Sequence, residues 1–185
     1  MKKIKTSIYI LLLIIISVSK ILAQNPLIDH NGTATFFSEA PMEDIEAINR
    51  KVIGAIDLQK GILAVTMQIK GFHFDKSLME EHFNENYLES DKYPKASFKG
   101  MIKNFSELDF SKQGNFEAQA IGELEIHGVT KPLKTMVQFA ISGDKISANT
   151  SFDISIADHD IKIPRLVIKN IAEVVEVKAS FNFSM

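Results

Sequence analysis

Residues 116–126 read FEAQAIGELEI, and apolar or small side chains occupy every second position from Phe116 onward. The positions between them are mostly polar and hold Glu117, Gln119, Ile121, Glu123 and Glu125. A period of two places alternate side chains on opposite faces of a β-strand. This stretch therefore predicts a strand with one face toward a core and the other toward solvent.

The same period of two recurs on both sides of this strand. The clearest further strands are predicted at residues 61–69, 96–103, 133–141, 146–154 and 175–183, with weaker ones at 33–37 and 51–58. The apolar phase slips between Ile69 and Phe72, which predicts a β-bulge around Gly71. Seven or eight antiparallel strands with one apolar face each must close on themselves or stack as two sheets, so the sequence predicts an all-β domain.

Helical signals are confined to two short stretches. Ser77-Leu78-Met79-Glu80 matches a capping box and predicts a helix over residues 78–83. Residues 41–49 predict a second short helix, because proline suits a first helical position and Ile45 and Ile48 are three residues apart. Residues 104–115 are polar and rich in turn formers, which predicts a loop between two strands.

The N-terminal 23 residues have the layout of a secretory signal peptide. Lysines precede an apolar run over residues 8–18, and a short stretch then leads to the small residue Ala23. The run is shorter than the roughly 20 apolar residues that a spanning helix needs. We therefore expect cleavage after Ala23, no stable membrane insertion afterwards, and one domain over residues 26–185. Because the chain has no cysteine, export to a bacterial periplasm is the predicted destination.

The charge of the chain argues against a nucleic-acid partner. Of its 21 Lys and Arg, four lie in residues 1–23, whereas none of its 23 Asp and Glu lies there, so the remainder has a formal charge of −6. Binding to nucleic acid depends largely on the neutralisation of phosphates by basic side chains. A mildly acidic domain is therefore not expected to bind nucleic acid.

Small residues stand near the middle of several predicted inward faces. They are Gly54, Gly100, Ala118, Ala120, Gly122, Ala148 and Ala179. In an eight-stranded barrel such positions leave room for one small ligand, but small residues also mark close packing, and alternation alone does not separate these readings. The apolar side chains predicted to line the lumen are Val65, Met67, Phe72, Phe74, Phe83, Phe98, Ile102, Phe116, Leu124, Phe139, Phe152, Val177 and Phe181.

The residues that could support catalysis or metal binding are scattered. Zinc-binding histidines commonly have three to five residues between them, and that spacing is missing from the five histidines of this chain. Residues 158–160, Asp-His-Asp, are predicted to form an exposed turn, and His82 a polar position on the capping helix. We therefore predict no catalytic residue, no metal and no cofactor. A hydrolase or isomerase would require His82 and Glu85 to face the lumen together.

Two motifs resemble the YceI family. Residues 82–98, HFNENYLESDKYPKASF, are similar to its segment of a short helix that leads through Tyr-Pro into a strand. Residues 122–131, GELEIHGVTK, are similar to its second hallmark. The resemblance implies an antiparallel, lipocalin-like barrel of about eight strands with a short capping helix. It also implies export to the periplasm and a polyisoprenoid or similar long amphiphile in the lumen.

Residue pattern and resemblance together predict a non-enzymatic periplasmic carrier. Its ligand would be a polyisoprenoid, an isoprenoid quinone or a similar lipid held in the barrel. The helix over residues 78–83, with Phe83, Tyr87 and Leu88, is predicted to act as a lid, and a homodimer is compatible with this prediction. The alternative is a structural or protein-interaction module whose filled barrel binds no ligand.

Overall fold

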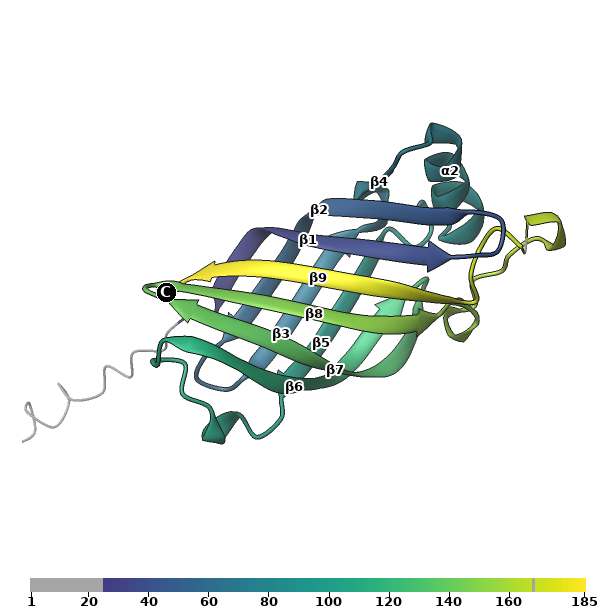
Figure 1. Ribbon diagram of the computed structural model, residues 1–185. Helices are drawn as coiled ribbons and strands as arrows, with labels where there is room; N and C mark the ends of the chain where they lie inside the picture. Colours follow the sequence, from purple (N-terminus) through teal and green to yellow (C-terminus); the bar gives the residue numbers. More distant parts are fainter. Residues whose placement is uncertain (1–24, 168) are drawn as a thin grey trace, which may run out of the picture.

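The alternating stretches form nine strands in the computed structural model, which describes residues 25–167 and 169–185 (Figure 1). The strands are β1 (Leu27–Glu39), β2 (Asp44–Asp57), β3 (Ile62–Gln68), β4 (Phe72–Phe74), β5 (Lys95–Ile102), β6 (Gly114–Ile126), β7 (Val129–Ser142), β8 (Lys145–Ser155) and β9 (Val174–Ser184). The predicted signal peptide lies outside the described residues.

Eight of these strands close into an antiparallel barrel. The order is β1-β9-β8-β7-β6-β5-β3-β2, and pairing of β1 with β2 completes the ring. The three-residue strand β4 pairs with β2 beyond the end of β3, opposite Ala47–Asn49. Closure satisfies the backbone groups that an open sheet would leave unpaired at its edges. The predicted barrel of about eight strands is therefore confirmed.

The helix predicted over residues 41–49 is wrong, because β2 begins at Asp44. Ala47 and Asn49 are buried while Glu46 and Arg50 are exposed, so side chains alternate between the two faces of the sheet. This segment pairs with β1 on one side and β4 on the other. Those ladders outweigh the weak helical signal of two isoleucines three residues apart.

The bulge predicted around Gly71 is instead a 3-10 turn over Ile69–Gly71. The turn packs on the buried side chain of Asn49, which donates a hydrogen bond from Nδ2 to the Gln68 carbonyl at 2.9 Å. A Cβ atom at position 71 would lie 2.6 Å from that nitrogen. Glycine thus lets the turn approach Asn49 closely, and the turn shifts the apolar phase between β3 and β4.

The helix α2 spans Ser77–His82 and continues into one π-helical turn over Phe83–Tyr87. The predicted capping box is wrong, because Lys76 is the N-cap residue and no side chain caps the first turn. The Glu80 carboxylate instead accepts a hydrogen bond from the Phe74 backbone N–H at 3.2 Å. This contact ties α2 to strand β4. Within the described residues, no helix has the length and apolar character needed to cross a membrane.

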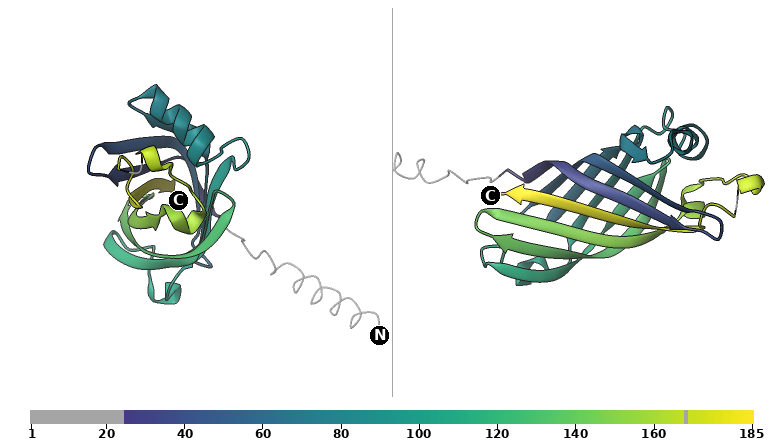
Figure 2. Two further views of the ribbon diagram at one scale, coloured as in Figure 1. Left: turned by 90° about the vertical axis from the view of Figure 1, so that its right-hand side faces the viewer. Right: turned by 45° about the horizontal axis from the view of Figure 1, so that its top comes forward.

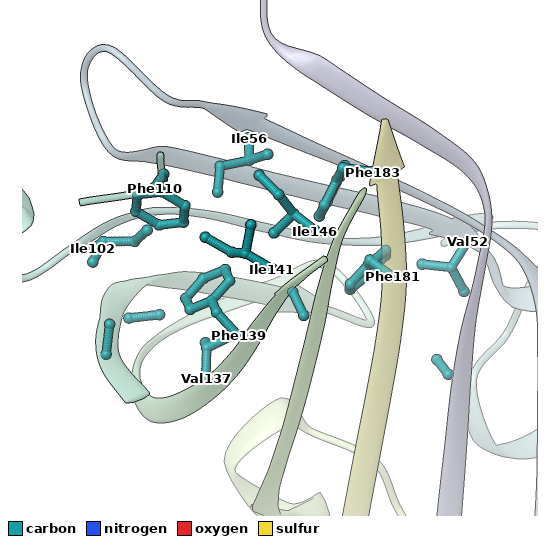
Figure 3. Close-up of a cluster of buried hydrophobic side chains, with 14 of the residues drawn as sticks. Val52, Ile56, Ile102, Phe110, Val137, Phe139, Ile141, Ile146, Phe181 and Phe183 are labelled. Carbon is teal, nitrogen blue, oxygen red and sulfur yellow. The ribbon is translucent and has the colours of Figure 1, made fainter. Parts of the chain in front are cut away.

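One end of the barrel is filled by a cluster of apolar side chains, which we call the floor (Figure 3). Its members come from the strand ends that meet there and from the loop before β6: Ile56, Ile102, Phe110, Phe116, Phe139, Ile141, Ile146 and Phe183. The ring of Phe110 lies 5.1 Å from that of Phe116 and 5.3 Å from that of Phe139, centroid to centroid. The loop predicted from its polar character therefore carries a buried aromatic group into the barrel.

Candidate functional site

A cavity of about 380 Å³ occupies the barrel between the floor and the opposite end. Phe139 and Phe183 border it at the floor, and Val137 and Ala148 lie on its walls. At the other end its lining includes residues of α2, of the β1–β2 hairpin and of the segment between β8 and β9. We call this end the mouth. Figure 2 (left) shows it face on, with α2 above and the β8–β9 segment across the opening.

All but two of the residues predicted to line the lumen border this cavity. They are Val65, Met67, Phe72, Phe74, Phe83, Phe98, Leu124, Phe139, Phe152, Val177 and Phe181. Ile102 and Phe116 belong instead to the floor. Both point inward as predicted, but they stand at the end of β5 and near the start of β6, where the loop bearing Phe110 fills the barrel. The role of the lining residues in ligand binding stays a prediction.

Of the glycines predicted to leave space in the lumen, Gly54 borders the cavity, whereas Gly100 and Gly122 do not. Gly100 and Gly122 face each other across β5 and β6, and the ring of Phe98 lies over both of them. Phe181 lies in the same way over Gly32 and Gly54. Because glycine has no Cβ, these positions let the aromatic rings lie flat against the wall. Of the four alanines predicted to face the lumen, Ala120, Ala148 and Ala179 border the cavity directly, whereas Ala118 lies in the buried apolar cluster.

An aromatic cluster holds the predicted lid at the mouth. The ring of Phe83 stacks on Phe36 at 5.4 Å and contacts Phe74 at 5.0 Å, centroid to centroid. Tyr87 and Leu88 follow on the same segment and also border the cavity. Burial raises the pKa of the Tyr87 hydroxyl above its usual value, so this group stays neutral. The segment after β4 therefore forms one apolar wall of the mouth.

Polar groups that border the cavity are few, and several of them bond within the protein. The hydroxyls of Thr135 and Thr150 lie 2.7 Å apart, and Thr150 also donates to the Met136 carbonyl at 2.8 Å. At the mouth, Ser38 Oγ accepts a hydrogen bond from the Ala172 N–H at 2.9 Å, and Glu43 pairs with Lys76. The interior thus offers mainly dispersion contacts to a guest, and polar side chains concentrate at the mouth.

The acid–base pair required for a hydrolase is not assembled in the cavity. His82 is an exposed residue of α2 that borders the mouth, whereas Glu85 is exposed and outside the lining. Among the described residues, no group of three or more histidine and acidic side chains is positioned to hold a metal ion. The geometry supports binding of an apolar molecule more directly than it supports chemistry on one.

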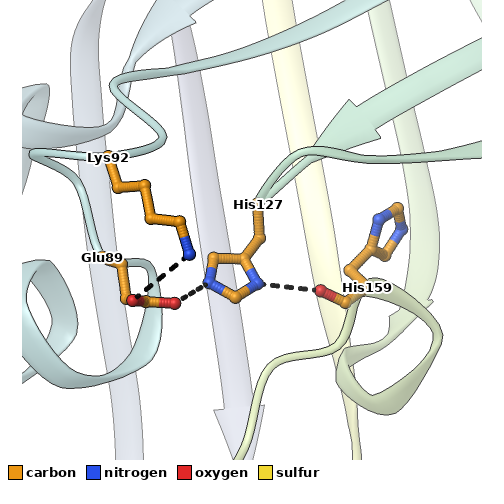
Figure 4. Close-up of polar contacts among 4 residues, drawn as sticks. All are labelled: Glu89, Lys92, His127 and His159. Atoms are coloured by element: carbon orange, nitrogen blue, oxygen red, sulfur yellow. Dashed lines mark hydrogen bonds and ion pairs between the residues drawn. The ribbon is translucent and has the colours of Figure 1, made fainter.

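A buried polar tie stands beside the mouth (Figure 4). Both ring nitrogens of His127 face acceptor oxygens, with Nε2 2.8 Å from Glu89 Oε2 and Nδ1 3.1 Å from the His159 carbonyl oxygen. His159 is 3% exposed and its own Nδ1 lies 3.1 Å from the Val129 carbonyl oxygen. The prediction of an exposed turn at residues 158–160 is therefore wrong for His159, which is buried. The tie joins the segment after α2, the β6–β7 turn and the segment after β8.

The two sequence motifs contact each other through the same turn. His127 and Gly128 form the two-residue turn between β6 and β7, with φ of 53° and 72°. Both angles are left-handed, as a type I′ hairpin requires. The Tyr93 ring packs on His127 at 4.5 Å, and a Cβ at Gly128 would lie 2.6 Å from that ring. The Tyr-Pro element thus closes over the glycine of the second motif, a long-range contact that the sequence analysis did not predict.

Comparison with known proteins gives this barrel a family. The family model described as a YceI-like domain matches residues 28–183. No curated protein matches the chain. A solved polyisoprenoid-binding domain from Saccharophagus degradans is 14% identical, with a TM-score of 0.71 over 86% of this chain and 97% of that one. BcnA from Burkholderia cenocepacia is 16% identical, with a TM-score of 0.67 over 82% and 95% of the two chains.

A YceI protein from Campylobacter jejuni has the same fold, with 14% identity and a TM-score of 0.55 over 73% of this chain and 80% of that one. At these identities the structural likeness shows the fold, and the family model carries the assignment. Because that model covers most of the sequence, from the first strand to the last, the chain belongs to the YceI-like family.

Proposed function

We propose that this protein binds a long apolar molecule in its barrel and carries or sequesters it in the bacterial periplasm, without catalysis. The candidate ligands are a polyisoprenoid, an isoprenoid quinone or a similar lipid. The observation that carries the proposal is the cavity of about 380 Å³, whose lining is largely apolar from the floor to the mouth. The solved domain from Saccharophagus degradans is described as polyisoprenoid-binding, which supports this ligand class for a related barrel.

Burial alone accounts for useful affinity in such a cavity. Removing apolar surface from water contributes about 25 cal/mol per Å², so a chain that buries roughly 300 Å² gains about 7 kcal/mol before the costs of association. Because the few polar groups bond largely to the protein itself, the walls select weakly among apolar chains. The protein would then distinguish ligands by their polar end, at the mouth, where Glu43, His82 and Asn170 border the cavity.

The alternative of a filled barrel without a ligand fits only the floor. A cluster of phenylalanines and isoleucines closes that end, and the remaining length is lined by side chains that leave space between them. Close packing of protein interiors normally leaves few voids larger than a water molecule. A void of this size in an apolar barrel favours a guest over a purely structural role.

The direct test is native mass spectrometry of the purified protein, with organic extraction of any bound lipid and uptake of an added polyprenyl compound after its removal. We expect Ala148→Leu to reduce uptake strongly, because this buried side chain borders the cavity. Ala140→Leu is the matched control, since Ala140 lies on the preceding strand and outside the cavity lining. Both variants should retain a cooperative thermal transition.

Recovery of no lipid, together with no uptake of the polyprenyl compound by the unaltered protein, would refute the carrier role. Equal uptake by Ala148→Leu and Ala140→Leu would show that the ligand does not occupy this cavity. Gly122→Leu is unsuited to the test, because its side chain would meet the Lys99 carbonyl and disturb the barrel itself.

A further inference from the structure

The segment between β8 and β9 combines apolar and basic side chains at the mouth. Residues 161–171 read IKIPRLVIKNI, with six aliphatic residues, three basic ones and no acidic one. The segment projects beyond the ends of the strands (Figure 1, yellow-green, right; Figure 2, right). It differs in charge from the domain as a whole, which has an excess of acidic residues.

The two kinds of side chain point in different directions. Ile161, Ile163, Val167 and Ile171 border the cavity. Lys162, Arg165 and Lys169 are exposed. The backbone is held by a 3-10 turn over Arg165–Val167, in which the Val167 N–H donates to the Pro164 carbonyl at 3.0 Å. The segment therefore presents cations to the outside, while the four aliphatic side chains just named continue the wall of the cavity.

An exposed apolar side chain lies beside this segment. Met42, at the tip of the β1–β2 hairpin, is 69% exposed, and its N–H donates to the Lys169 carbonyl at 3.3 Å. Glu43 on the same hairpin is paired with Lys76. The exposed acids of the β1–β2 hairpin and of the β8–β9 connection, Glu39, Asp44, Glu46, Asp158, Asp160 and Glu173, lie outside residues 161–171. Glu81 and Glu85 are exposed on the α2 segment.

We propose that this surface, formed by Lys162, Arg165, Lys169 and Met42, docks on an anionic lipid bilayer with the mouth facing the membrane. Basic side chains bind acidic headgroups, and exposed apolar side chains enter the boundary between headgroups and acyl chains. An acidic protein partner would also complement the basic side chains of this surface. A bilayer explains in addition why the surface lies at the opening of an apolar cavity. When the protein is docked in this way, an apolar chain can move between the membrane and the barrel without crossing water.

The purpose of docking rests on the proposed function, whereas docking itself is measurable without any ligand. The test uses the chain from Gln24 onward, which contains the complete barrel, because the apolar run of residues 8–18 would bind lipid by itself. We expect it to sediment with vesicles of phosphatidylcholine and phosphatidylglycerol in equal parts, and far less with phosphatidylcholine alone. Raising the salt concentration should weaken binding.

Charge removal tests where the protein binds. The triple variant Lys162→Gln, Arg165→Gln, Lys169→Gln should bind the anionic vesicles roughly 100-fold more weakly, at about fivefold for each basic side chain near the surface. The matched control removes the exposed Lys103, Lys134 and Lys145 from the barrel wall and the floor end, and it should bind within a few fold of the unaltered protein.

An environment-sensitive probe tests the orientation, because the chain contains no tryptophan. Fluorescence of Met42→Trp should shift to shorter wavelength when anionic vesicles are added. Met101→Trp, on the wall strand β5 at 55% exposure, should show no shift.

Equal binding of the triple variant and its control, or a shift of Met101→Trp without one of Met42→Trp, would overturn the assignment. Failure of the unaltered protein to bind either vesicle would also overturn it and leave a protein as the partner of this surface. Loss of polyprenyl uptake with intact vesicle binding would instead count against the proposed function alone.

Discussion

The floor makes a quantitative prediction about ligand length. Phe110 is 8% exposed, and its ring packs against Phe105, Phe116 and Phe139 at centroid distances of 5.7, 5.1 and 5.3 Å. Replacing it with alanine removes the aromatic group that the loop before β6 inserts into the barrel. The cavity should then extend toward that loop.

The stability cost follows from the packing of this ring. A buried Phe→Ala change typically costs about 3–5 kcal/mol, and the loss is smaller where surrounding groups can relax. Phe110 lies on a loop at the end of the barrel, so we expect about 3 kcal/mol in the free energy of unfolding, measured by urea denaturation. Phe105→Ala is the control, because Phe105 is only partly buried and should cost less.

The binding consequence concerns the longest chain that the barrel accepts. Each additional buried methylene contributes about 0.8 kcal/mol, which is about fourfold in affinity, until the chain meets the floor. For the unaltered protein, affinity in a series of polyprenyl compounds should rise with length and then level off. Phe110→Ala should move this plateau to a longer chain, and displacement of a fluorescent lipid would measure it.

Two results would refute this reasoning. A loss of less than about 1 kcal/mol would show that Phe110 is not packed as described. A plateau at the same chain length in both proteins, with the expected loss of stability, would show that the floor does not limit the ligand.

Four further predictions follow from other parts of the molecule. Glu89→Ala should lower the free energy of unfolding by about 1–3 kcal/mol in urea denaturation, because it leaves a ring nitrogen of buried His127 unpaired. Gly122→Ala should lower the thermal midpoint, because the added Cβ meets the backbone of β5, at a cost of about 1–3 kcal/mol. Hydrogen bonds from the side chain and backbone of Ser111 lower the pKa of Asp109, a stabilisation present above the unfolded-state pKa and lost as pH falls, so the effect of Asp109→Asn on unfolding should vanish in acid. N-terminal sequencing of the protein released from a bacterial periplasm should begin at Gln24, and a chain retained in the membrane would contradict the predicted cleavage.

The strands could be predicted because alternation is a local signal. A strand with one buried face carries its pattern within ten residues, and the stretch at 116–126 pairs over its whole length with β7. The segment at residues 41–49 misled the prediction because proline and two spaced isoleucines are equally local. What decides its conformation is pairing with β1 and β4, which lie outside the window.

The cavity was only partly predictable, because alternation indicates direction and not depth. It identified inward-facing residues correctly, including Ile102 and Phe116, but it could not show that a loop carries Phe110 between them. The prediction that the glycines leave open space in the lumen failed for a related reason. The sequence shows which residues are neighbours along the chain. It does not show that the ring of Phe181 lies over Gly32 and Gly54, because that contact joins segments that are distant in the sequence.

The arrangement of floor, tie and mouth gives the two sequence motifs a common physical purpose. Because the floor closes one end, the proposed ligand would enter and leave through the mouth. The Glu89–His127–His159 tie and the Tyr93–Gly128 contact both lie beside it, and they join the segment after α2 to the strands behind it. The motifs therefore join the elements around the opening, and both also supply side chains to the cavity wall, among them Phe83, Phe98 and Leu124. A substitution in either motif can thus change the frame of the opening and the surface that the proposed ligand would meet.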